Sequence, residues 1–237
     1  MHRPMLSMVQ SRARRASLAA WVLAVLAFTL PGCGRFKMGS YSAVEGSGVS
    51  KTESRSVGSF SEVEIGNAMK LQVQLGEKTA VEVTGDDNLV PLVQTLVTGD
   101  RLTVSFDGSY STKIGISVKV TTPKLTALSG SGASALTATD FWGNPLKLQL
   151  SGASSASVSG KVETLDVECT GASRVLAKDL AAKAVKVDAS GVSHVEVNAS
   201  DQLDAKASGA SSIDYVGKPK MVWPQASGAS RVTELAR

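Results

Sequence analysis

The chain has 237 residues, of which 43% are hydrophobic, 19% are charged and only 5% are aromatic, and its formal net charge is +4. Four arginines in the first 32 residues carry that excess, because no acidic residue accompanies Arg3, Arg12, Arg14 and Arg15. The rest of the chain is formally neutral and lacks the broad positive field on which nucleic-acid binding relies. We therefore do not expect nucleic acid as a partner.

The N-terminus has the order of an export signal. A basic stretch precedes an apolar run from Leu18 to Leu30, which is shorter than the roughly 18 apolar residues needed to span a bilayer. The next residues, Leu30-Pro31-Gly32-Cys33, resemble the lipobox of bacterial lipoproteins, although proline is unusual at its position. This resemblance implies a signal peptide over residues 1–32 and a lipid-anchored Cys33, which would make a membrane the first partner. An ordinary signal peptide with an incidental cysteine is the alternative.

Residues 33–56 are predicted to be the lipidated N-terminus and a flexible tether. The segment after Gly34 is rich in Gly and Ser and has no sustained periodicity, as in linkers that hold a domain away from a membrane. Residue 34 is glycine and not aspartate, and in this respect the chain resembles lipoproteins that are sent on to the outer membrane.

A β domain is predicted over residues 57–237. Apolar and polar residues alternate there with the period of two that is typical of half-buried strands. The first alternating apolar residues are Phe60, Val63, Ile65, Met69, Leu71, Val73, Leu75, Val81 and Val83. Two more strands are predicted from Leu102 to Phe106 and from Ile114 to Val120.

One short helix is predicted between these strands. Leu89, Leu92, Val93 and Leu96 recur at helical spacing, and Asp87 or Asn88 offers a cap within the preceding Asp86-Asp87-Asn88 run. The same run also resembles part of a cation site, but polar residues between a strand and a helix are more often turn and cap. We therefore predict no metal there.

A repeat organises the second half of the chain. Turns of the type Ser-Gly-Ala-Ser recur at steps of 18 to 20 residues, which is typical of a solenoid with one coil per repeat. Glycine is expected where the strand must turn, since it alone reaches positive φ without a steric cost. These structural glycines are Gly132, Gly152, Gly171, Gly191, Gly209 and Gly228.

Columns that alternate in character appear when the repeats are aligned on their glycines. Two sets of small aliphatic residues, six before and four after the glycine, are predicted to face inward. They are Leu146, Leu165, Val185, Leu203 and Val222, and Leu136, Ala156, Val175, Val195, Ile213 and Val232. Five before the glycine, Lys147, Asp166, Lys186 and Asp204 should face outward and alternate in sign along the stack.

The pattern as a whole resembles a known family. Its features are the strand Phe60-Ser61-Glu62-Val63-Glu64-Ile65-Gly66-Asn67, the segment Gly85-Asp86-Asp87-Asn88-Leu89 and the repeated Ser-Gly-Ala-Ser turns. From about Val57 to Val232 they resemble the head GIN domain of auto-transporter adhesins. The resemblance implies a right-handed, parallel β-helix-like solenoid, with coils of about 19 residues preceded by further strands. The family name implies adhesion at the cell surface.

Catalytic, metal and cofactor sites are not expected. One histidine and one unmodified thiol beyond the anchor do not make a zinc cluster, and Cys169 fits a small core residue. Arg174 and His194 fall in the outward column three after the glycine, without an acid in that column, so we interpret His194 as a solvated surface residue. The turn serines follow the repeat, and no base accompanies each of them.

The pair Phe141-Trp142 is predicted to lie in the loop between two coils. It would either plug a gap over the core or contact a sugar or another partner. Together with Arg174 and His194, it completes the residues that we predict for partner contact.

The sequence therefore predicts a non-enzymatic, membrane-anchored lipoprotein of the bacterial envelope, which acts as an adhesin-like binding or structural module. Its partners would be envelope or extracellular macromolecules, either protein or polysaccharide, and the two ends of an open solenoid also allow self-association. Two alternatives stay open. They are a polysaccharide-active β-helix lyase or hydrolase, and a periplasmic envelope scaffold.

Overall fold

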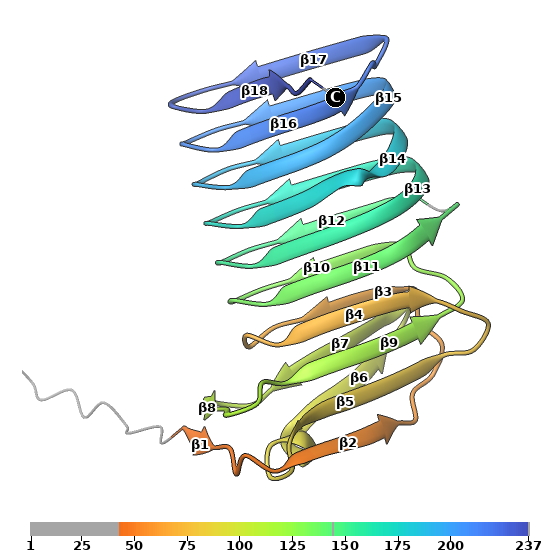
Figure 1. The fold of residues 1–237 in the computed structure, drawn as a ribbon, viewed down its shortest axis with the longest axis vertical. Helices are drawn as coiled ribbons and strands as arrows, with labels where there is room; N and C mark the ends of the chain where they lie inside the picture. Colours follow the sequence, from red (N-terminus) through yellow and green to blue (C-terminus); the bar gives the residue numbers. More distant parts are fainter. Residues whose placement is uncertain (1–42, 144, 237) are drawn as a thin grey trace, which may run out of the picture. The chain divides into compact units, whose positions relative to one another are not determined.

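A computed structural model describes residues 43–143 and 145–236, and these residues form 18 strands and one single-turn 3-10 helix. All strands except the short pair β1 (Val44–Glu45) and β8 (Tyr110–Ser111) belong to one continuous hydrogen-bonded sheet, which is folded into two walls. The sheet confirms the predicted all-β solenoid, and its stacked coils are seen in Figure 1.

Each wall is built mainly from parallel strands. The first wall contains, in spatial order, β6 (Val93–Thr98), β7 (Arg101–Phe106), β3 (Glu62–Ile65), β10 (Ala127–Gly130), β12 (Leu146–Leu150), the C-terminal halves of β13 (Ser155–Cys169), β14 (Arg174–Ala189) and β15 (His194–Ala207), and β17 (Met221–Ala226). The second wall contains β2 (Ser50–Arg55), β5 (Ala80–Asp86), β9 (Ser117–Thr122), β4 (Lys70–Leu75), β11 (Ala135–Trp142), the N-terminal halves of β13, β14 and β15, β16 (Ser212–Gly217) and β18 (Arg231–Glu234).

Two sets of coils can be distinguished. From β10 onward each coil lies on the coil that precedes it in the sequence, in parallel register. In the N-terminal region the order differs, because β3 lies between β7 and β10 and β4 lies between β9 and β11. Antiparallel pairs close this end of the stack. In the first wall β6 pairs with β7, and in the second wall β5 pairs with both β2 and β9.

The core lies between the two walls. The predicted inward columns are buried from Leu136 to Ile213, and Val222 and Val232 in the last coil are half-buried. The buried apolar side chains of the described residues form one core cluster, and all of them belong to the compact unit Ser40–Arg237. Small aliphatic residues fill the space because neighbouring coils repeat the same narrow cross-section.

The repeated turns, which we call the serine-glycine corner, connect the first wall to the second. The six repeat glycines have φ between 71° and 79°. A Cβ on Gly171 would lie 2.5 Å from the carbonyl oxygen of Gly152 in the coil below, so a side chain would collide with backbone. That close approach lets Ala172 N–H donate to the same oxygen at 2.7 Å.

The last serine of each turn donates its hydroxyl to the carbonyl of the first residue, as Ser154 Oγ does to Ser151 O at 2.7 Å. This serine is buried in all of these turns except the last, where Ser230 is half-buried. These hydrogen bonds satisfy turn carbonyls that the strands leave unpaired.

Two expectations about the N-terminal region are wrong. The predicted helix is only the 3-10 turn η1 (Val90–Leu92), followed directly by β6, and Leu96 is 64% exposed. Antiparallel pairing of β6 with β7 provides more backbone hydrogen bonds than a short helix would, which overrides the apolar spacing. Residues 44–45 and 50–55 of the expected tether form β1 and β2, which pair with β8 and β5. Residues 43, 46–49 and 56 lie between or beside these strands, and only residues 33–42 of the expected tether lie outside the described residues.

Candidate functional site

The outer face of the first wall is a polar surface with a regular spacing. In-register strands place equivalent side chains about 4.8 Å apart from coil to coil. Lys147, Asp166, Lys186 and Asp204 are successive register partners, as the sequence predicted. The ion pair that Lys147 forms is diagonal, however, and joins its Nζ to Glu168 Oε1 at 2.9 Å.

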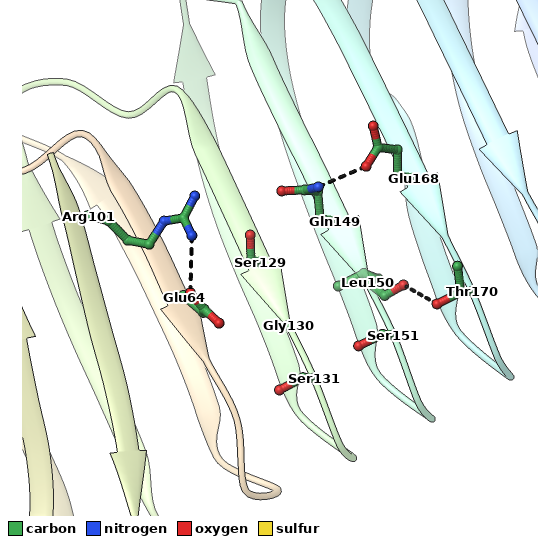
Figure 2. Close-up of a pocket in the computed structure, with 10 residues that line it drawn as sticks. All are labelled: Glu64, Arg101, Ser129, Gly130, Ser131, Gln149, Leu150, Ser151, Glu168 and Thr170. Carbon is green, nitrogen blue, oxygen red and sulfur yellow. Dashed lines mark hydrogen bonds and ion pairs between the residues drawn. The ribbon is translucent and has the colours of Figure 1, made fainter. Parts of the chain in front are cut away.

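A hollow of about 310 Å³ lies in this face where small residues interrupt the columns (Figure 2). Ser129, Gly130 and Ser131 of β10 and the turn after it form its floor, between larger polar residues on either side. The residues that line it are Glu64, Arg101, Ser129, Gly130, Ser131, Gln149, Leu150, Ser151, Glu168 and Thr170. The hollow is therefore open, polar and shallow.

The charged groups around this hollow are already paired. Arg101 contacts Glu62 Oε2 at 2.9 Å and Glu64 Oε2 at 3.4 Å, and Gln149 Nε2 donates to Glu168 Oε2 at 2.8 Å. The hydrogen bond to Glu62 raises the pKa of Arg101, and the bond from Lys147 is the main cause that lowers the pKa of Glu168. Glu168 is thus an ionised acceptor, whereas a glycosidase acid needs a carboxyl with a raised pKa.

The second wall brings together side chains that the sequence analysis kept apart. Arg174 and His194 are register partners, as predicted. His194 also lies with its Nδ1 2.7 Å from Ser212 Oγ and its Nε2 3.2 Å from Glu196 Oε1, and Asp214 Oδ2 is 3.7 Å from Nδ1. No acid stands in the column of His194, as the sequence predicted, but the two acids come from the column two positions further along. His194 is therefore half-buried and hydrogen-bonded, and the interpretation of it as a solvated surface residue is wrong.

The signal for this cluster was Glu196, two residues after His194 on the same face of the strand. The hydroxyl, imidazole and carboxylate resemble the order of a nucleophilic triad. Ser212 is, however, only 6% exposed, so its hydroxyl serves as a hydrogen-bonding group of the wall and is poorly placed to attack a substrate.

The predicted contact pair Phe141-Trp142 is divided by the fold. Phe141 is 2% exposed and belongs to the core, so its assignment to partner contact is wrong, whereas Trp142 is 69% exposed. Both lie in β11 and not in a loop. An extra residue in β11 between Ala138 and Phe141, with Asp140 at φ 55°, forms a β-bulge that reverses the facing of the residues after it.

The acidic side chains before η1 accept hydrogen bonds from other residues of the protein. Asp86 is fully buried and accepts hydrogen bonds from Gly48 N at 2.6 Å and Thr112 Oγ1 at 2.5 Å, while Ser47 Oγ donates to Asp87 at 2.5 Å. These contacts tie the N-terminal segment to the fold. The run acts as a turn that organises this segment. Among the described residues no cluster of three metal-ligating side chains occurs.

The two cysteines differ in what the structure says of them. Cys33, the predicted lipidation site, lies outside the described residues. Cys169 is buried in the core, where desolvation raises the pKa of its thiol to about 12. Over the part of the chain that the structure describes, no helix has the length and apolar character needed to cross a bilayer.

Comparison with known families agrees with this architecture. The sequence profile of the family "Putative auto-transporter adhesin, head GIN domain" matches residues 59–219, well over half of the chain. The chain therefore belongs to this family of adhesin-type domains. No curated protein matches the chain.

Two solved structures have the same fold. A crystal structure described as a putative adhesin from Bacteroides fragilis has a TM-score of 0.67 and 23% identity, covering 81% of this chain and 100% of that one. A second, described as a putative lipid binding protein from Parabacteroides distasonis, has a TM-score of 0.52 and 17% identity, covering 82% and 100% respectively. At these identities the likeness establishes the fold alone.

Proposed function

We propose that this protein is a non-enzymatic binding module of the bacterial envelope, lipid-anchored through Cys33 and adhesin-like in its mode of action. The family provides the expectation of adhesion. The observation that carries the proposal is the outer face of the first wall, where in-register columns of polar side chains form an extended surface with shallow hollows. Solenoids use such faces to bind macromolecules without a deep pocket.

The electrostatics of the face also favour binding over catalysis. Around the hollow at Ser129, the carboxylates of Glu62, Glu64 and Glu168 are held by Arg101, Lys147 and Gln149. Charged groups fixed in this way give a partner a defined pattern of donors and acceptors. The hydrogen bond from Lys147 lowers the pKa of Glu168 and keeps this acid ionised, which suits recognition better than proton transfer.

Protease shaving of intact cells that produce the full chain tests the location. We expect immunoblotting to lose this protein while a periplasmic control survives, and the same cells should adhere to coated surfaces better than cells without it. Protection until the envelope is opened, together with unchanged adhesion, would contradict the adhesin role.

The anchor has a separate test. Replacing Cys33 with Ala should abolish acylation and release the protein from the membrane fraction, as measured by mass spectrometry and fractionation. Replacing Cys169 with Ala is the matched control and should leave acylation intact. A Cys33→Ala variant that still carries lipid would overturn the anchor.

A further inference from the structure

The described residues contain two tryptophans, Trp142 and Trp223, and both are exposed, at 69% and 49%. Tryptophan is highly buried on average, and an indole on the surface offers a flat, amphipathic face to a ligand. Trp223 lies in β17 on the outer face of the first wall, directly beside its register partner Asp204. It therefore continues the charged column that runs through Lys186 and Asp166.

A second hollow of the first wall lies against Trp223. Its volume is about 440 Å³, within the range of pockets for small ligands. Asp166, Lys186, Gln202 and Asp204 place polar groups around it. The small side chain of Ala184 stands between larger neighbours, which leaves the space open.

The polar groups of this hollow form fewer hydrogen bonds and ion pairs with the protein than those around Ser129. Among the described residues, Asp204 Oδ1 is buried and has no hydrogen-bond partner. No ion pair within 4.0 Å joins Lys186 to Asp166 or Asp204 in the described structure, although they are register partners. A buried acceptor without a donor is unfavourable, so a ligand that draws the Asp204 carboxylate into a hydrogen bond would relieve it.

We propose that the hollow at Trp223 binds a pyranose ring of an uncharged polysaccharide. The indole offers an apolar platform for the C–H face of the ring. The carboxylates of Asp166 and Asp204 accept hydrogen bonds from sugar hydroxyls, and Lys186 and Gln202 donate to ring and hydroxyl oxygens.

The charges at the site favour a neutral sugar over other ligands. Two carboxylates against one ammonium repel phosphates, nucleic acids and anionic glycans. One indole surrounded by polar groups is too small an apolar surface for an acyl chain. This inference rests on the proposed binding function and names the ligand class of its first wall.

The test measures retention of residues 40–237 on immobilised dextran, mannan, xylan and chitin, with hyaluronan as the anionic comparison. We expect retention on at least one neutral polysaccharide and none on hyaluronan. Replacing Trp223 with Ala should weaken that binding about tenfold or more. Asp204→Asn should weaken it about threefold or more, because a neutral amide oxygen is a weaker acceptor.

Trp142→Ala is the matched control, because it removes the other exposed indole from the second wall and should leave binding within about twofold. Circular dichroism checks that each variant is folded. The inference is overturned if the protein is not retained on any neutral polysaccharide, if Trp223→Ala binds normally, or if Trp142→Ala causes the same loss of binding.

Adhesion of whole cells to protein-coated surfaces distinguishes the two proposals. Chain-dependent adhesion without any polysaccharide binding would overturn the sugar site and leave the adhesin-like function standing. Loss of both would overturn both.

Discussion

The repeated coils from β10 onward and the N-terminal region are built from similar strands, but they are specified in different ways. In the repeated coils each strand lies on the strand one repeat earlier, and glycine occupies every corner. In the N-terminal region β3 lies between β7 and β10, and Asn67 takes the corner position with φ 58°. Asn67 fits there because its side-chain oxygen accepts from Phe106 N at 3.2 Å. A fold can therefore continue where its sequence repeat stops.

The largest expected effect is at the corner glycines. Gly171→Ala would place a Cβ 2.5 Å from the Gly152 carbonyl oxygen at φ 76°, whereas Gly99→Ala in the N-terminal region, at φ 60°, has open space around it. We expect the first change to lower the free energy of unfolding by about 3 kcal/mol or more, and the second by only about 1–2 kcal/mol. Urea denaturation measures both, and equal losses would contradict the role of stacking at the corner.

The next effect concerns acid stability of the N-terminal region. The hydrogen bond from Thr112 is the main cause that lowers the pKa of Asp86, and Gly48 N–H adds to it. A lowered pKa in the folded state contributes stability above the ordinary value of 3.8, and this contribution is lost as pH falls through the folded value. Asp86→Asn should therefore lower Tm near neutral pH and reduce its acid dependence, as measured by thermal denaturation over pH.

The matched control for Asp86 is Asp107→Asn, an exposed residue of the same region. It should change Tm little at any pH. An Asp86→Asn variant with the wild-type pH profile would show that the contacts at Asp86 do not organise this end of the fold.

A smaller effect is expected from the buried turn hydroxyls. Ser154→Ala removes the bond to Ser151 O and should cost about 1 kcal/mol of unfolding free energy. Ser151→Ala keeps that acceptor carbonyl and should cost less. If the two variants lose the same stability, the hydroxyl of Ser154 is not what stabilises the turn.

The smallest effect is expected from the surface ion pair of the first wall. Lys147→Gln should change the free energy of unfolding by under about 1 kcal/mol, because the pair with Glu168 is partly exposed and screened by salt. A double-mutant cycle with Glu168→Gln, repeated at high salt, isolates the pairing energy. A coupling that persists unchanged at high salt would indicate a buried interaction, against the observed exposure.

Much of the fold could be predicted because the repeat fixes it. A period near 19 residues with glycine at each corner indicates one coil per repeat, and strand alternation then assigns which side chains face inward. The helix at Leu89 could not be excluded in the same way. Its apolar spacing fits a helix as well as an irregular turn, and the pairing of β6 with β7 decides between them.

The candidate sites were less accessible to sequence reasoning. Which of Phe141 and Trp142 faces inward depends on the single extra residue at Asp140, and a one-residue shift exchanges the two faces of a strand. His194 contacts Glu196 of the neighbouring column on its own strand and Asp214 on the strand of the next coil, so no single column of the aligned repeats shows the cluster. The hollow at Trp223 depends on the small residue Ala184 in a coil below it.

The sequence by itself determined the repeat length, the corner glycines, the inward columns and the polar character of the outer faces, because each of these is a local pattern copied from coil to coil. Only the tertiary structure decided the order of the N-terminal strands, the facing of Trp142 and the grouping of side chains into hollows. These depend on pairing between residues far apart in the chain, where a single bulge or an antiparallel partner changes which atoms meet.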